Sequence, residues 1–307
     1  MATVRAIPLD RPDPEASVLE RAVCLTLSMG RFGNTRKVAT ALINVDADKA
    51  RLAVSKRLLD SPELEAIQRF DKQLRDWIEA EALPLPMFRG SYVVPIPSVE
   101  KVDQHLRDVI PQRTALIETA CTAYPQRIRE STTALRVVFE PTNYPSVERF
   151  RGMFYLDWRW ITIGTPNQLR QISATFFREE REKAAQYWTE AMEEGKQFLR
   201  GIFLELVKHA RERLEPGPEG KPRIFRNSMV ENISTFLDTF NARNIADDSQ
   251  LAELVGQMRQ LAAGVEPEDL RGDSGLRRAW ARELGKIETT LNSMVIDKPT
   301  RRITFED

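Results

Sequence analysis

The sequence predicts a mainly α-helical protein with a small β element, in which a compact α+β head carries a helical arm. Apolar residues recur at steps of three and four over long stretches, which is the period of an amphipathic helix. One short stretch near the N-terminus alternates apolar and polar residues, which is typical of a half-buried strand. With 307 residues, 42% of them hydrophobic, the chain is long enough for one large or two modest domains.

The first elements are predicted from this alternation and from turn residues. Residues 1–16 are rich in proline and charge and are expected to form a loose arm. Residues 23–29 alternate with period two and form the predicted strand. A glycine-containing turn follows, so residues 36–40 are expected to return as the second strand of a hairpin. The extended stretch 91–96 is a candidate partner for this hairpin.

Two helices are predicted between these strands and the middle of the chain. Ser61 caps the first, the proline after it occupies the first helical position, and the helix ends near Leu83. The second helix spans residues 98–130. Pro111 and Pro125 are expected to kink or interrupt it.

The clearest predicted element is a helix from 176 to 214, which would be roughly 58 Å long at the α-helical rise. Its length and apolar stripe favour a coiled-coil arm. Proline and glycine residues then form a linker at 215–223. Shorter helices are predicted after the linker, at residues 227–241, 248–264, 266–271 and 275–295.

These elements suggest one assembly. The helices at 98–130 and 176–214 are expected to pair as an antiparallel hairpin, so that residues 98–214 form an arm with a tip insertion at 131–175. Residues 17–97 and 224–307 are expected to form the α+β head at the other end.

The predicted tip is rich in aromatic residues, and two interpretations of them are open. They fill the core of a small tip subdomain, or they are exposed and contact a partner or a membrane. The candidate partner-binding residues are Tyr144, Phe150, Phe154, Trp158 and Trp160.

Basic residues gather in two places. Some are interleaved with the tip aromatics, a combination that suits single-stranded nucleic acid, and others surround the predicted hairpin. A charged edge strand in contact with solvent is the alternative explanation for the second set. The candidate nucleic-acid-binding residues are Arg31, Arg36, Lys37, Arg149, Arg151 and Arg159.

The composition limits the chemistry that the chain can perform. Lys and Arg number 45 and Asp and Glu number 45, so no whole face is expected to coat nucleic acid or an anionic membrane. Two histidines and two cysteines leave few ways to build a zinc site or a histidine-based triad. The sequence also lacks a phosphate-binding P-loop and a nucleophile elbow. We therefore expect no enzyme, no cofactor and no metal.

The cysteines and the N-terminus indicate a compartment. Cys24 and Cys121 lie far apart in apolar surroundings, which favours buried free thiols. The N-terminus has no apolar stretch of signal-peptide length, and no window approaches the roughly 18 apolar residues of a membrane span. These features predict a cytoplasmic protein without a transmembrane segment.

Several short stretches resemble an uncharacterised family of bacteriophages and proteobacteria that is known only as a domain of unknown function. They are Asp46-Ala-Asp-Lys, Val54-Ser-Lys-Arg-Leu-Leu-Asp-Ser-Pro, Leu83-Pro-Leu-Pro, Arg89-Gly-Ser-Tyr-Val-Val-Pro, Asn143-Tyr-Pro-Ser, Arg149-Phe, Gly220-Lys-Pro-Arg-Ile-Phe-Arg and Glu231-Asn. The resemblance implies a phage- or mobile-element-associated protein, often encoded near a MoxR-type AAA+ ATPase and a von Willebrand factor A-like protein. It supplies no catalytic residues.

The sequence therefore favours a non-enzymatic assembly or adaptor protein that acts by oligomerisation with itself or by binding another protein, such as an AAA+ ATPase, through the helical arm. A nucleic-acid-binding accessory factor in phage replication or defence is the alternative. A membrane-active helical protein is a further alternative.

Overall fold

The computed structural model describes residues 18–42, 46–85, 88–215 and 227–295, which are mainly helical with small antiparallel sheets. The predicted fold class, mainly α with a small β element, is confirmed. The predicted arm at 1–16 and all but the first residue of the predicted linker lie outside the described residues. The strands are β1 (Ala22–Met29), β2 (Thr35–Val38), β3 (Val54–Arg57), β4 (Leu83–Pro84), β5 (Ser91–Pro95) and β6 (Leu156–Ile161). The helices are α2 (Pro62–Glu81), α3 (Val99–Leu135), α4 (Val147–Gly152), α5 (Leu169–Ile172), α6 (Ala174–Leu214), α7 (Asn227–Arg243), α8 (Ser249–Ala262), α9 (Pro267–Gly272) and α10 (Ser274–Met294).

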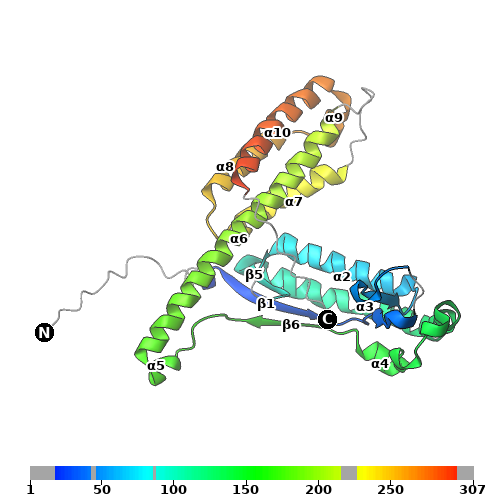
Figure 1. Cartoon of the computed structure of the whole chain (residues 1–307). Helices are drawn as coiled ribbons and strands as arrows, with labels where there is room; N and C mark the ends of the chain where they lie inside the picture. Colours follow the sequence, from blue (N-terminus) through cyan, green and yellow to red (C-terminus); the bar gives the residue numbers. More distant parts are fainter. Residues whose placement is uncertain (1–17, 43–45, 86–87, 216–226, 296–307) are drawn as a thin grey trace.

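β1 lies inside the larger sheet, whose strand order is β4-β5-β1-β6 (Figure 1). It pairs antiparallel with both neighbours, so that Cys24 lies opposite Val93 on one side and Leu27 lies opposite Trp158 on the other. The expectation that residues 91–96 pair with the first strand is confirmed, because this stretch contains β5.

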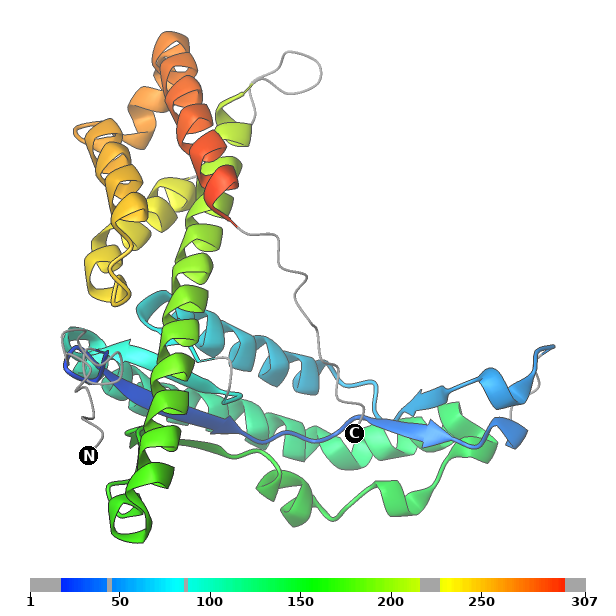
Figure 2. The same ribbon diagram turned by 60° about the vertical axis from the view of Figure 1, so that its left-hand side comes forward.

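The alternation in β1 divides its side chains between the two faces of the sheet. Leu25 and Leu27 are buried in a core shared with α2 and α3. Cys24 points to the opposite face, where α6 crosses the sheet and buries Trp188 in the same cluster (Figure 2). Further along this face β1 carries Thr26, whose hydroxyl lies 3.1 Å from that of Ser91. The strand is therefore apolar on both faces where helices cover it.

The predicted hairpin between residues 23–29 and 36–40 is wrong. β2 instead pairs with β3 in a separate two-stranded sheet, and β6 occupies the position beside β1. Asn34 helps to explain why the chain after β1 pairs with β3. Its side-chain amide donates to the Leu59 carbonyl, and its side-chain oxygen accepts from the Leu59 backbone N–H. These two hydrogen bonds join residues 25 apart in sequence and hold the chain before β2 beside the end of β3 rather than beside β1.

Both predicted helices between β3 and the middle of the chain are present. The Ser61 hydroxyl accepts a hydrogen bond from the Leu64 backbone N–H and Pro62 is the first residue of α2, as the capping pattern predicts. α3 continues through Pro111 and Pro125, so neither proline ends it. α2 and α3 lie side by side on one face of the sheet (Figure 2).

The predicted antiparallel pairing of 98–130 with 176–214 is not what the structure shows. α3 packs mainly against α2, whereas α6 packs mainly against α10 and crosses the sheet (Figures 1 and 2). The apolar stripe of α6 is used within the chain: its first half covers β-strands, and its second half joins α7, α8, α9 and α10 in one core. A long amphipathic helix needs a partner, but its sequence does not say which one.

Residues 131–175 do not form a tip at the end of a helical hairpin. Their central part is β6, an edge strand of the main sheet. Trp158 and Trp160 lie on the face that α3 covers, and both indole N–H groups donate to one oxygen of Asp103, at 2.9 and 3.1 Å. The period of two in Leu156, Trp158 and Trp160 is the strand signal within this segment.

The ion pair between Glu63 and Arg127 generates a pH-dependent prediction. The two side chains join α2 to α3, with 2.7 Å between Arg127 Nη2 and Glu63 Oε1. Hydrogen bonding to Arg127 lowers the pKa of Glu63 to about 2. A lowered folded-state pKa stabilises the protein above the ordinary carboxyl pKa, and this stabilisation is lost as the pH falls toward 2.

We expect Glu63→Gln to reduce the free energy of unfolding at pH 7 by about 1–2 kcal/mol, and the reduction to shrink toward pH 3. Urea unfolding at both pH values measures the difference. Glu65→Gln, an exposed carboxylate on the same helix, is the matched control and should change stability little. An equal effect of Glu63→Gln at both pH values would contradict the assignment.

Candidate anion-binding pocket

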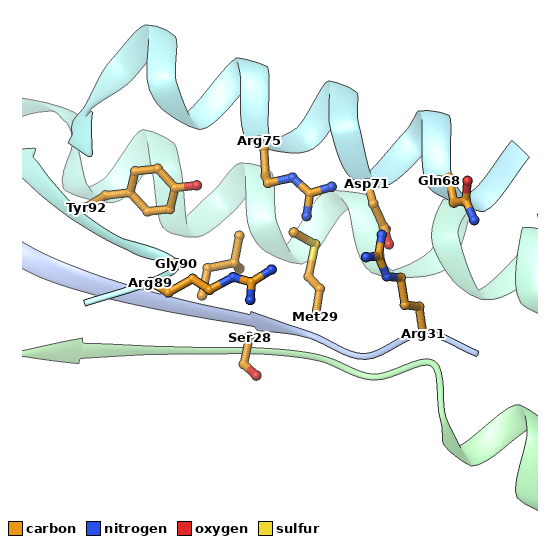
Figure 3. A pocket seen from close by; sticks show the side chains of 10 residues that line it. Ser28, Met29, Arg31, Gln68, Asp71, Arg75, Arg89, Gly90 and Tyr92 are labelled. Atoms are coloured by element: carbon orange, nitrogen blue, oxygen red, sulfur yellow. The ribbon is translucent and has the colours of Figure 1, made fainter. Parts of the chain in front are cut away.

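The most distinctive cavity lies between α2, the end of β1 and the turn before β5, with a volume of about 460 Å³ (Figure 3). Its lining is more polar than a typical small-molecule site and contains three arginines and one carboxylate. The lining residues are Leu27, Ser28, Met29, Arg31, Gln68, Asp71, Arg75, Arg89, Gly90 and Tyr92.

Each arginine comes from a different part of the chain. Arg75 lies on α2, Arg31 follows the end of β1, and Arg89 lies in the turn that leads into β5. Figure 3 shows the side chains of Arg75 and Arg89 reaching into the hollow from opposite sides. The cavity thus depends on the tertiary arrangement of the helix, the strand and the turn.

Gly90 brings the turn close to β1. Its φ of +75° lies in the left-handed region, and its carbonyl accepts a hydrogen bond from the Leu27 backbone N–H at 2.7 Å. A Cβ at this position would lie 2.5 Å from the Leu27 carbonyl oxygen. Both the backbone angle and the close approach therefore require glycine here, and they fix Arg89 beside the pocket.

Asp71, the one carboxylate among the lining residues, is already neutralised. It accepts hydrogen bonds from Arg113 Nε at 2.8 Å and from Arg113 Nη2 at 3.3 Å, and both side chains are almost fully buried. The same Nη2 donates to the Gly30 carbonyl at the end of β1. The charge of Asp71 is thus compensated by Arg113, which is not among the residues that line the pocket.

The three pocket arginines have no such partner. Among the residues that the structure describes, Arg31, Arg75 and Arg89 make neither an ion pair within 4.0 Å nor a hydrogen bond. Burial raises the pKa of Tyr92 to about 12, so its hydroxyl stays neutral at the back of the cavity. The pocket therefore presents several cationic hydrogen-bond donors around one volume, an arrangement that suits a ligand with more than one negative charge.

The structure disperses the predicted basic residues. Arg31 lines the pocket, whereas Arg36 and Lys37 are exposed on β2. Arg151 makes a two-pronged ion pair with Glu118 across α3 and α4.

The other two basic candidates also lie apart from the pocket. Arg149 is exposed on α4. Arg159 lies 3.7 Å from Asp157 on β6 and pairs with Thr26, on the sheet face away from α2 and α3. Of the six predicted residues, only Arg31 lines this pocket.

The predicted aromatic residues are also separated. Phe150 and Phe154 are buried, with Phe150 stacked on Tyr124 at a ring-centre distance of 4.0 Å. Tyr144 is half-buried and donates its hydroxyl hydrogen to the Leu58 carbonyl. Together with Trp158 and Trp160, which lie half-buried over α3, these residues contribute to packing in two different cores.

Sequence reasoning missed Arg75 and Arg89. Both look like ordinary surface charges in the sequence. A usable signal was Asp71, which stands in the buried stripe of α2 beside Ile67, Leu74 and Ile78. A charged residue in the buried stripe of a helix needs a partner of opposite charge, so it indicates that other charged side chains lie nearby.

Within the described parts of the chain, no group of three or more His, Cys, Asp or Glu side chains could hold a metal ion. None of the described helices has a stretch that is long and apolar enough to cross a membrane. Comparison with family models, with curated proteins and with solved structures finds no significant match.

The buried ion pair behind the pocket generates a stability prediction. Arg113→Met leaves Asp71 as an uncompensated buried charge, so we expect the free energy of unfolding to fall by about 3–5 kcal/mol. Adding Asp71→Leu to this variant removes the stranded charge and should recover much of the loss. Lys72→Met, which breaks the exposed pair with Asp76 on the same helix, should cost at most about 1 kcal/mol.

Urea unfolding of these variants at pH 7 measures the differences. Equal effects of Arg113→Met and Lys72→Met would show that the buried pair does not hold α2, α3 and β1 together.

Proposed function

We propose that this protein is a non-enzymatic adaptor that holds a partner by an anionic group bound in the arginine pocket. The observation that carries the proposal is the set of three guanidinium groups that line one cavity, none of which makes an ion pair within 4.0 Å in the described chain. Its one lining carboxylate is bound to Arg113, so the lining offers binding groups rather than a nucleophile with a free base.

The geometry favours a compact ligand with several negative charges. A guanidinium group donates two parallel hydrogen bonds to a phosphate or a carboxylate, and three of them around about 460 Å³ can share one polyanionic group. The AAA+ ATPase implied by the resemblance is one protein that such an adaptor would connect to its anionic partner.

Nucleic acid is the second candidate, because a second pocket with basic side chains nearby adjoins the arginine pocket. Gln68 lines both this pocket and a neighbouring one of about 180 Å³ that includes Thr35 and Arg57. The exposed Arg36 and Lys37 lie next to Thr35 on β2. A phosphodiester backbone would follow such a path, with phosphates contacting successive basic side chains.

The test uses inorganic tripolyphosphate as the probe, with binding measured by calorimetry at low ionic strength. We expect Arg75→Ala and Arg89→Ala each to weaken binding at least tenfold, because each removes a charge-assisted contact of about 1.5–3 kcal/mol. Arg69→Ala is the matched control, since Arg69 is exposed on α2 but does not line the pocket. The control should bind like the wild-type protein.

Absence of binding by the wild-type protein, or equal losses in all three variants, would disprove the pocket assignment. A single-stranded oligonucleotide provides the second arm. If Arg36→Ala weakens binding of the oligonucleotide but not of tripolyphosphate, and binding falls steeply with salt, the nucleic-acid function is favoured over the adaptor.

A further inference from the structure

The middle of α6 has an apolar face that the rest of the described chain leaves partly uncovered. Phe198, Ile202 and Leu206 stand four residues apart, are half-buried, and line a shallow hollow on the helix. Ile202 and Leu206 also line a pocket of about 260 Å³ toward α2 and α7, whose wall includes Phe236. The apolar surface is therefore continuous from the side of α6 into the groove beside it.

Gly201 stands at the centre of this face. Glycine is the poorest helix former after proline, and Gly201 lies in the interior of the 41-residue α6. A Cβ at this position would meet nothing within 4 Å, so no packing in the described chain requires its absence. A residue without a side chain, placed among half-exposed apolar residues, allows the backbone of another helix to approach closely.

The charges around Gly201 are arranged symmetrically. Glu194 lies seven residues before it and Lys208 seven residues after it, and both are exposed. Seven residues correspond to about two helical turns, so both charges lie near the side of the helix that carries Gly201. Neither charge makes an ion pair within the described residues. One end of the face therefore carries an unpaired carboxylate and the other an unpaired ammonium group, at equal distances from Gly201. Glu205 lines the hollow between Gly201 and Lys208, and Gln197 takes the matching position on the other side of Gly201.

We propose that this face binds a second copy of the chain, with the two α6 helices antiparallel and crossing at Gly201. In this arrangement Glu194 of each copy lies opposite Lys208 of the other, and the apolar side chains pack between the two ion pairs. A two-fold interface uses the same patch twice, so it must be complementary to itself. The order Glu194–Gly201–Lys208 satisfies this condition, because the two charges exchange places when the helix is turned antiparallel about Gly201. The inference is independent of the arginine pocket.

Charge reversal provides the first test, with sedimentation velocity over a roughly hundredfold range of concentration as the measurement. The wild-type chain is expected to form a dimer. Glu194→Lys and Lys208→Glu should each raise the dimer dissociation constant at least tenfold, because like charges then face one another. The double variant restores both pairs and should dimerise like the wild type. Glu182→Lys, an exposed reversal earlier on α6, is the matched control and should leave dimerisation unchanged.

Gly201→Leu provides the second test. Because a Cβ at Gly201 meets nothing within 4 Å and leucine is a better helix former than glycine, the substitution should leave the melting temperature of the monomer undiminished. The added side chain should nevertheless separate the two helices and abolish the dimer. A wild-type chain that stays monomeric throughout the concentration range overturns the proposal. The proposal is also overturned if the Gly201→Leu variant still dimerises, or if the double charge variant does not dimerise like the wild type.

Discussion

The buried ion pair between Asp71 and Arg113 is the interaction on which the centre of this structure depends. It joins α2 to α3, and the Arg113 guanidinium also binds the Gly30 carbonyl, where β1 ends. Both side chains lie out of water, so each charge is tolerated only because the other is there. One consequence extends beyond stability. Because Asp71 is paired with Arg113, the one carboxylate that lines the pocket makes no ion pair with the pocket arginines.

β1 connects this region to the rest of the chain, because its side chains alternate between the two faces of the sheet. Leu25 and Leu27 bind the sheet to α2 and α3, while Cys24 lies in the core that α6 shares with the C-terminal helices. A single strand thus belongs to two cores, one on each face. Gly195 marks the crossing of α6 over β4, because a Cβ there would lie only 3.0 Å from Leu83. The long helix therefore has a fixed place on the sheet rather than extending from it as a free arm.

The sequence predicted individual helices, strands and caps correctly, but it did not predict which elements pack together. The cap at Ser61, the strand at 23–29 and the long helix after residue 174 each depend on neighbouring residues, so periodicity and capping rules identified them. The partner of a strand or a helix depends on residues far away in sequence. Hence β6, rather than the stretch after Gly33, occupies the edge beside β1. Arg75 and Arg89 were missed for the same reason: their convergence exists only after α2 and the β5 turn have packed.

The charge composition gives the pocket its significance. The chain has equal numbers of basic and acidic residues, and its described surface contains many paired charges, including Lys72 with Asp76 and Arg151 with Glu118. Of the three pocket arginines, Arg31 and Arg89 are exposed and Arg75 is half-buried. None of them makes an ion pair within 4.0 Å in the described chain, although the charge of Arg75 acts on the Glu79 carboxylate. Cations held close together repel one another, and a concave surface screens them less well than open solvent does. An anion that enters the pocket would offset this repulsion between the arginines. The proposed anion binding therefore rests on the placement of these three arginines around one hollow.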